Sequence, residues 1–286
     1  MNRIVRISCK DGVELQGFLG VSDNSKKAIL HVHGSCGNFY ENMFLDNMAR
    51  DYCNAGVTFL SMNTRGHDYI ADLKIGKDDE YTWMTAGGYY DIFDDSLLDI
   101  QAGMDFLTNL GYTEIILQGH SLGAVKVCYA ALEGLCRQII LMAPPDVIAI
   151  QKAHLGNRFD KVLLLALERK SSGKGMSLMP KNVYEHRISA NSYISLFNYG
   201  SMASVFQYSE ESDLGSIYVS NDNIKCIALI GNNDEYLVVP IEKVDKWFRK
   251  CFTNIEIEII PDCGHSFQGC EQILVDRILG WIEQNH

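Results

Sequence analysis

ILQGHSLGAVKV, residues 116–127, places one serine between two glycines at the point where the hydrophobic pattern changes. A short apolar run typical of a strand precedes Ser121, and a run with helical spacing follows it. A sharp strand-to-helix turn lifts a side chain out of the backbone, and glycines relieve the crowding in such a bend. We therefore expect the G-x-S-x-G pattern from Gly119 to Gly123 to present Ser121 as a nucleophile.

Short apolar runs and helical runs alternate on both sides of this turn. Strands are expected at residues 27–34, 57–63, 113–119, 137–143, 224–231 and 255–260, and helices at 41–56, 96–111, 124–135, 241–251 and 270–284. A β-hairpin is expected near the N-terminus, around Asp11 and Gly12. Such alternation is typical of an α/β fold with a mostly parallel central sheet and helices on both faces.

The alternation breaks at residues 143–146, APPD, and resumes only at residue 224. The intervening stretch of about 80 residues is too long for an ordinary connection. It contains a helical run at 158–170 and an aromatic-rich run at 191–214. We expect residues 1–145 and 224–286 to form the core, and residues 146–223 to form an inserted cap over the edge of the sheet where ligands bind in open α/β folds. A structural side lobe is the alternative.

The composition limits the classes of partner. Acidic residues outnumber basic ones, 36 to 25, in a chain of 286 residues with a formal net charge of −11. Such a field repels nucleic acid and anionic lipid. Nine cysteines form no disulfide scaffold, and an odd number cannot all pair within the chain. The first 19 residues lack the apolar core of a signal peptide, and no stretch approaches the roughly 20 apolar residues of a membrane span. We expect a cytoplasmic protein without a membrane or nucleic-acid partner.

A histidine that can take the proton of Ser121 is expected near the far end of the chain. His265 lies in the loop PDCGHSF, just past the last predicted strand and therefore at the same sheet edge as the serine. The carboxylate expected to orient its ring is Asp234, directly after the preceding strand, with Glu235 beside it. Asp262 is the rival, although its closeness in sequence to His265 makes the far ring nitrogen awkward to reach.

The oxyanion of a tetrahedral intermediate needs preorganised N–H donors, each worth on the order of 3–4 kcal/mol. The first is expected to be the amide of Leu122, the residue after the nucleophile. The second is expected in the loop HGSCGN, where the amide of Ser35 is the candidate and Cys36 the adjacent alternative. His33 and Gly34 are expected to shape this loop rather than to react.

The candidate residues also allow two other interpretations, a metal site and a cysteine enzyme, for which the sequence offers less support. His31 and His33 would share one face of a strand, but no nearby third ligand accompanies them, so we expect no metal site. Acyl transfer through a serine also needs no cofactor. Cys36 and Cys263 lie near the expected site and leave a cysteine enzyme as an alternative, yet neither occupies the turn at the end of the strand.

Together these residues resemble the α/β-hydrolase superfamily. The similarity rests on HVHGSCGN, NTRGHD, GHSLG, GNNDEYLVVP and CGHSF, which carry the serine, acid and histidine in the order of the superfamily. A narrower similarity, in MPKN, ISANSYISLF, SEESDLGSI and NDEYLVV, is to the branch that includes fungal siderophore esterases. The acidic and aromatic loop at residues 63–93 departs from many relatives and is a candidate roof for the pocket.

The leading functional hypothesis is a serine hydrolase that cleaves a carboxylic ester of a small molecule through an acyl-enzyme on Ser121. An amidase, a thioesterase or an acyltransferase would use the same groups, because the pocket and not the triad selects the acyl donor. A non-catalytic receptor that binds a small molecule is the alternative from another class. The sequence leaves the oligomeric state and the physiological substrate open.

Overall fold

The computed structural model describes residues 2–23, 25–77, 80–209 and 223–285 of the chain. Its centre is an eight-stranded sheet in the order β1-β2-β4-β3-β7-β8-β9-β10. The last six strands of this order run parallel, and β1 and β2 join them as an antiparallel hairpin. The strands are β1 (Arg3–Ser8), β2 (Glu14–Gly20), β3 (Lys27–Val32), β4 (Thr58–Met62), β7 (Glu114–His120), β8 (Gln138–Met142), β9 (Lys225–Gly231) and β10 (Asn254–Ile260). The predicted α/β fold with a mostly parallel sheet is confirmed.

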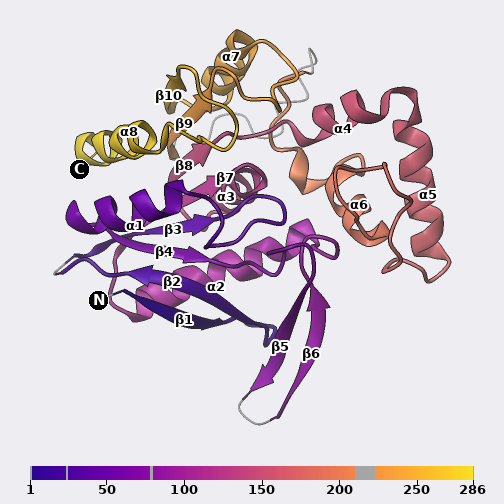
Figure 1. Ribbon diagram of the computed structural model, residues 1–286, viewed down its shortest axis with the longest axis horizontal. Coiled ribbons are helices and arrows are strands. Elements are labelled where there is room, and N and C mark those ends of the chain that lie inside the picture. Colours follow the sequence, from indigo (N-terminus) through magenta and orange to yellow (C-terminus); the bar gives the residue numbers. More distant parts are fainter. Residues whose placement is uncertain (1, 24, 78–79, 210–222, 286) are drawn as a thin grey trace.

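Helices cover both faces of this sheet, as the continuous apolar runs of its central strands require. One face is covered by α1 (Phe44–Asn54) and α8 (Glu271–Gln284), which lie side by side (Figure 1). The other face is covered by α2 (Ser96–Asn109), α3 (Leu122–Leu132) and α7 (Ile241–Cys251). Each of these helices follows a pattern that predicted it: α7 has the expected bounds, and the other four differ from theirs by a few residues.

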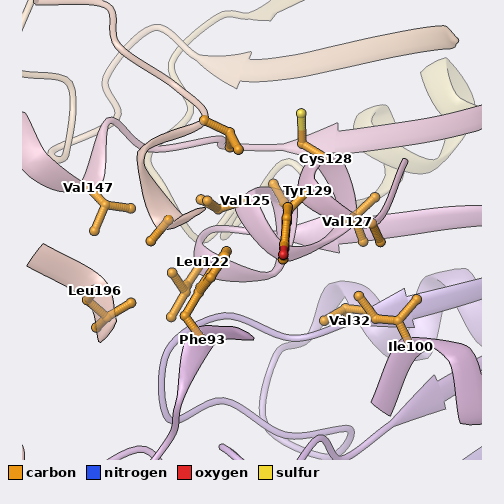
Figure 2. Packing of buried hydrophobic residues seen from close by; sticks show 14 of the residues in the cluster. Val32, Phe93, Ile100, Leu122, Val125, Val127, Cys128, Tyr129, Val147 and Leu196 are labelled. Atoms are coloured by element: carbon orange, nitrogen blue, oxygen red, sulfur yellow. The ribbon is translucent and has the colours of Figure 1, made fainter. Parts of the chain in front are cut away.

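The helix that follows Ser121 is buried along almost its whole length. Its residues from Leu122 to Ala131 are all buried. Figure 2 shows Leu122, Val125 and Tyr129 of this helix among other apolar side chains, which include Val32 of β3 and Phe93. A helix that is apolar all round belongs in the interior. Packing on every side therefore fixes the start of α3, on which the candidate nucleophile stands.

The segment at residues 63–93 folds differently from the expectation that it roofs a pocket. It forms a separate two-stranded antiparallel sheet of β5 (Ala71–Lys77) and β6 (Glu80–Ala86), which projects from the body of the protein (Figure 1). None of the described residues 63–93 lines the cavity beside Ser121. The expectation was wrong because acidic and polar composition indicates exposure to solvent but not the direction in which a hairpin extends.

The stretch between β8 and β9 contains α4 (Val147–Leu155), α5 (Phe159–Ser171) and α6 (Ala190–Phe197), beside the carboxyl ends of the parallel strands (Figure 1). Hydrogen bonds to Asp146 connect the start of this stretch to Ser209, the last described residue before the gap at residues 210–222. One carboxylate oxygen accepts the amide of Ala149 at the start of α4, at 3.0 Å, and the other accepts the amide and the hydroxyl of Ser209, at 3.2 and 3.1 Å. Residues 210–222, which carry most of SEESDLGSI and the end of the expected cap, lie outside the described residues. Within the described part of the chain, no helix is long and apolar enough to cross a membrane.

A buried ion pair joins α3 to the loop after β6. Lys126 Nζ lies 2.6 Å from a carboxylate oxygen of Asp91, and the lysine side chain is only 2% exposed. A charge this far from water is costly unless a partner of opposite charge stays with it. The pair therefore makes the position of α3 depend on the loop between β6 and α2.

Removal of either partner alone should destabilise the protein strongly. We expect Asp91→Leu to lower the free energy of unfolding by about 3–5 kcal/mol, because it leaves the Lys126 ammonium buried and unpaired. The double variant Asp91→Leu/Lys126→Met should recover most of that loss. Urea denaturation of the single and double variants measures both values. A double variant that is as unstable as Asp91→Leu alone would contradict this interpretation. As a control, Arg249→Met breaks an exposed ion pair with Asp245 and should change the free energy of unfolding little.

Candidate active site

Ser121 stands at the junction of β7 and α3 in a backbone conformation that few residues other than glycine adopt. Its φ is 56° and its ψ is −126°. A Cβ on Gly119 would lie 2.2 Å from the carbonyl oxygen of Gly123, and a Cβ on Gly123 would lie 2.1 Å from that of Val32. Both glycines are therefore required for the helix to start so close to the strands. The backbone strain at Ser121 is maintained by this close packing.

The structure brings Ser121, His265 and Asp234 together in one line of hydrogen bonds. The serine Oγ lies 2.8 Å from His265 Nε2, and His265 Nδ1 lies 2.9 and 3.0 Å from the two carboxylate oxygens of Asp234. Because a carboxylate only accepts, Nδ1 carries the ring hydrogen and Nε2 is free to accept the hydroxyl proton. The histidine and the aspartate are 6% and 8% exposed. Asp262, the rival acid, is exposed and makes no hydrogen bond to this ring among the described residues.

Three neighbours of His265 were not predicted to touch it. Glu235 accepts its backbone N–H at 3.0 Å, and His120 Nε2 donates to its carbonyl oxygen over 2.9 Å. The ring of Tyr236 packs on the imidazole with 4.5 Å between ring centroids. Glu235 and Tyr236 could have been suspected from the sequence, because they directly follow Asp234 in NDEY. Their position in the sequence does not show in which direction their side chains point. The loop that carries His265 is thus held through its backbone as well as its ring.

The loop after β3 approaches the serine closely. A Cβ on Gly34 would lie 3.0 Å from the Cβ of Ser121 and 3.5 Å from its Oγ. Ser35 and Leu122 line the cavity beside the serine, and their backbone N–H groups have no acceptor among the described residues. Cys36, the alternative donor, does not line this cavity. Ser35 and Leu122 therefore both lie beside Ser121 with backbone N–H groups that no described residue accepts.

His33 supports this loop from below. Its Nδ1 donates to the carbonyl oxygen of Gly34 over 2.7 Å, and its Nε2 accepts the backbone N–H of Thr64 at 3.0 Å. It is 1% exposed and does not reach the cavity. His31 instead accepts a hydrogen bond from Gln118 at 2.8 Å. The described residues contain no cluster of three potential ligands that could hold a metal ion.

A cavity of about 210 Å³ opens beside Ser121. Its apolar walls come mainly from the stretch between β8 and β9. Its polar lining residues include Glu41 and Glu185, and no lysine or arginine is among the described lining residues. The apolar lining residues are Leu122, Pro145, Val147, Ile150 and Phe197. The other described tyrosines and phenylalanines of the aromatic-rich run at 191–214 do not line it: Tyr193, Phe206 and Tyr208 are buried elsewhere, and Tyr199 is exposed.

Burial keeps several histidines near the site neutral. The pKa of His120 is lowered to about 3, chiefly by burial and then by the neighbouring imidazole of His265. The pKa of His33 is also lowered to about 3, by burial and then by the charge of Lys126. Burial lowers the pKa of His31 well below its ordinary value. These rings therefore act as neutral hydrogen-bonding groups around Ser121.

Comparison with known proteins bears on the fold. No protein-family model matches the chain, and no curated protein sequence matches it. The structure of Est1E from Butyrivibrio proteoclasticus with ferulic acid bound matches 98% of each chain at 18% identity, with a TM-score of 0.69. The α/β hydrolase GrgF from Penicillium sp. sh18 gives a TM-score of 0.70 at 16% identity, over 99% of this chain and 98% of its own. The esterase Pf2001 from Pyrococcus furiosus gives a TM-score of 0.63 at 17% identity, over 99% of this chain and 91% of its own. The chain therefore has the α/β-hydrolase fold, as its motifs predicted.

The buried neutral histidines should make stability depend on pH. Each of these histidines has a folded-state pKa below its unfolded value of about 6.5. The stability that the neutral ring contributes is therefore fully present above about pH 6.5 and is lost as the pH falls toward about 3. Between pH 7 and pH 5 the loss amounts to about 2 kcal/mol for each such histidine. His120→Phe should reduce this loss by that amount in urea denaturation at the two pH values. Equal pH dependence in the variant and the parent would contradict the prediction, and His154→Phe, which changes an exposed ring, should leave it unaltered.

Proposed function

We propose that the protein is a serine hydrolase that cleaves carboxylic esters of small molecules, with Ser121, His265 and Asp234 as its catalytic triad. The observation that carries the proposal is the 2.8 Å contact between Ser121 Oγ and His265 Nε2, in a ring whose Nδ1 is held by Asp234. Nucleophile, base and orienting acid in hydrogen-bond reach of one another are what acyl transfer requires. The fold shared with solved esterases supports the same reading.

In the first half of the proposed reaction, Ser121 Oγ attacks the ester carbonyl carbon and its proton passes to His265 Nε2. The carbonyl oxygen gains the negative charge and accepts hydrogen bonds from the N–H groups of Leu122 and Ser35. The imidazolium is stabilised by the Asp234 carboxylate. When the tetrahedral intermediate collapses, the bond to the alcohol oxygen breaks, and this oxygen takes the proton from His265. An ester of Ser121 remains.

In the second half, water replaces the alcohol. His265 Nε2 takes a proton from the water as its oxygen attacks the acyl carbon, and the same two N–H groups bind the new oxyanion. Collapse of this intermediate breaks the bond to Ser121 Oγ, which regains its proton from the imidazolium. The carboxylic acid leaves, and the triad returns to its starting protonation state. Over the cycle the alcohol leaves with the proton of the serine, the serine regains one proton of the water through His265, and the other proton of the water stays on the carboxylic acid.

We also propose that residues 146–223 form a cap that selects the substrate. The support is that α4, the segment before α6 and α6 itself contribute Val147, Ile150, Tyr184 and Phe197 to the cavity beside Ser121. A pocket lined by apolar groups from an inserted segment can vary without altering the triad. The similarity to the branch with fungal siderophore esterases stays a prediction, since part of its motif lies outside the described residues.

The charge of the cavity argues for neutral or cationic esters. Glu41 and Glu185 lie among its lining residues, and no described lining residue carries a fixed positive charge. An anionic substrate would meet repulsion there, whereas an ammonium group would be attracted. Both carboxylates are exposed to solvent, so the effect is a preference of a few-fold rather than an absolute barrier.

Ser121→Ala should abolish turnover of small aryl esters such as p-nitrophenyl acetate. The expected loss in kcat is about 10⁴-fold or more, because the nucleophile is removed. Reaction of the parent protein with a fluorophosphonate probe, detected as a single mass adduct on Ser121, tests the same group. Ser8→Ala, which changes an exposed serine on β1, is the matched control and should retain full activity.

Two results would contradict this function. Retained turnover in folded Ser121→Ala would show that another group is the nucleophile. A folded parent protein that neither hydrolyses any acyl donor nor reacts with the probe would favour a non-catalytic binding protein. A panel of esters, thioesters and amides with the same acyl group then separates the hydrolase classes that share this triad.

The charge preference can be measured with an isosteric pair of substrates. We expect kcat/KM for acetylcholine to exceed that for 3,3-dimethylbutyl acetate by about 3- to 10-fold at low ionic strength, and the ratio to fall as salt is added. Glu41→Gln/Glu185→Gln should bring the ratio close to one. Glu242→Gln/Glu283→Gln alters the net charge equally at exposed positions away from the cavity and should leave the ratio unchanged. A ratio near one in the parent protein would refute the preference.

A further inference from the structure

One contact between the stretch 146–223 and the core lies directly on the loop that carries Ser35. His186, from the segment between α5 and α6, places its Nε2 3.0 Å from Ser35 Oγ and 3.2 Å from Cys36 Sγ. The side chain of His186 is 10% exposed. A histidine about 150 positions further along the chain thus meets two consecutive residues of this loop.

The hydrogen bonds of His186 fix which nitrogen accepts. Its Nδ1 donates to the carbonyl oxygen of Arg187 over 2.8 Å, so Nε2 carries the lone pair. Burial lowers the pKa of His186, which keeps the ring neutral. The pKa of Cys36 is raised to about 12 by burial, so its thiol keeps its hydrogen. Nε2 is therefore an acceptor that faces two donors, the hydroxyl of Ser35 and the thiol of Cys36.

Aromatic rings hold this imidazole in place. Tyr89 stacks on it with ring planes 13° apart and centroids separated by 5.8 Å. Tyr184 meets it edge to face at 4.6 Å and Tyr69 at 5.9 Å. The acceptor therefore has a fixed position, which a free surface histidine would lack.

The loop that His186 contacts is strained and needs such support. Cys36 has a φ of 52°, in the region that favours glycine. Its Sγ occupies the space beside Gly88, where a Cβ would come within 2.2 Å of the sulfur. A strained backbone conformation persists only where surrounding contacts hold it. The contacts with His186 and Gly88 supply that restraint.

We propose that His186 is a positioning residue, which holds the Ser35–Cys36 loop so that the N–H of Ser35 is directed at the oxyanion. This inference rests on the proposed function, because it concerns the donor on which that reaction depends. His186 does not line the cavity beside Ser121, and its hydrogen bonds go to Ser35, Cys36 and Arg187 and not to the proposed triad. Its effect therefore appears in stabilisation of the transition state and not in binding of the ground state.

The test compares two substitutions of His186. His186→Phe keeps a ring for Tyr89 to stack on but removes the acceptor, and it should lower kcat by roughly 10- to 100-fold with KM within about 3-fold of the parent value. His186→Gln keeps an acceptor and should recover most of the loss. An alkyl boronic acid, which mimics the tetrahedral intermediate, should bind His186→Phe more weakly by a factor similar to the loss in kcat/KM.

Controls separate a positioning role from a structural one. His154→Phe changes an exposed histidine on α4 and should retain parent values of kcat, KM and boronic acid affinity. If His186→Phe fails to fold, Ser35→Ala serves instead: it removes one donor but keeps the backbone N–H, and it should lower kcat and boronic acid affinity together by a few-fold. Thermal unfolding of each variant reports folding independently.

The proposal is overturned if a folded His186→Phe retains parent kcat, if KM rises while boronic acid affinity is unchanged, or if His186→Gln is as impaired as His186→Phe. Unchanged kcat and boronic acid affinity in Ser35→Ala would overturn it as well. Each of these results leaves the proposed function intact, because the parent protein remains an active esterase. Lack of esterase activity in the parent protein would instead refute the proposed function itself.

Discussion

The close approach of α3 to the ends of β7 and β3 is the constraint on which the candidate site depends. The helix can begin there only because positions 119 and 123 lack side chains that would meet backbone oxygens. Three properties go with the same contact: the left-handed φ of Ser121, the place of Ser121 in the lining of the cavity, and the N–H of Leu122 at the first turn of the helix, which has no acceptor among the described residues. A small retreat of the helix would remove all three together.

The imidazole opposite this serine lies on a loop, where regular hydrogen bonding cannot fix its position. Each polar group of His265 has its own partner instead: Asp234 and Ser121 for the ring, Glu235 and His120 for the backbone. The neutral state of His120 matters here. In the proposed reaction, a second positive ring 5.2 Å away would oppose formation of the His265 imidazolium, whereas a neutral ring only donates to the loop carbonyl.

The sequence predicted features that depend on local pattern and on chain order. The turn at Ser121, the parallel strands and the meeting of His265 with Asp234 follow from hydrophobic periodicity and from the rule that parallel strands end at one edge. The contacts of His120 and His186 did not follow, because the direction of a side chain across the tertiary structure leaves no periodic signal. The hairpin β5–β6 and the short α6 were missed for a related reason: composition indicates exposure or burial but not the element formed.

The stretch between β8 and β9 is joined to the core at both sides of the serine. Glu185 accepts the hydroxyl of Tyr236 at 3.1 Å, and Tyr236 packs on the imidazole of His265. The next residue, His186, contacts the loop of Ser35. Two consecutive residues of one segment therefore contact Tyr236, which packs on the proposed base His265, and Ser35, the proposed N–H donor. Under the proposed function, exchange of this segment for one of different shape would alter the pocket and the proposed catalytic geometry at once, so substrate selection and chemistry would be mechanically coupled.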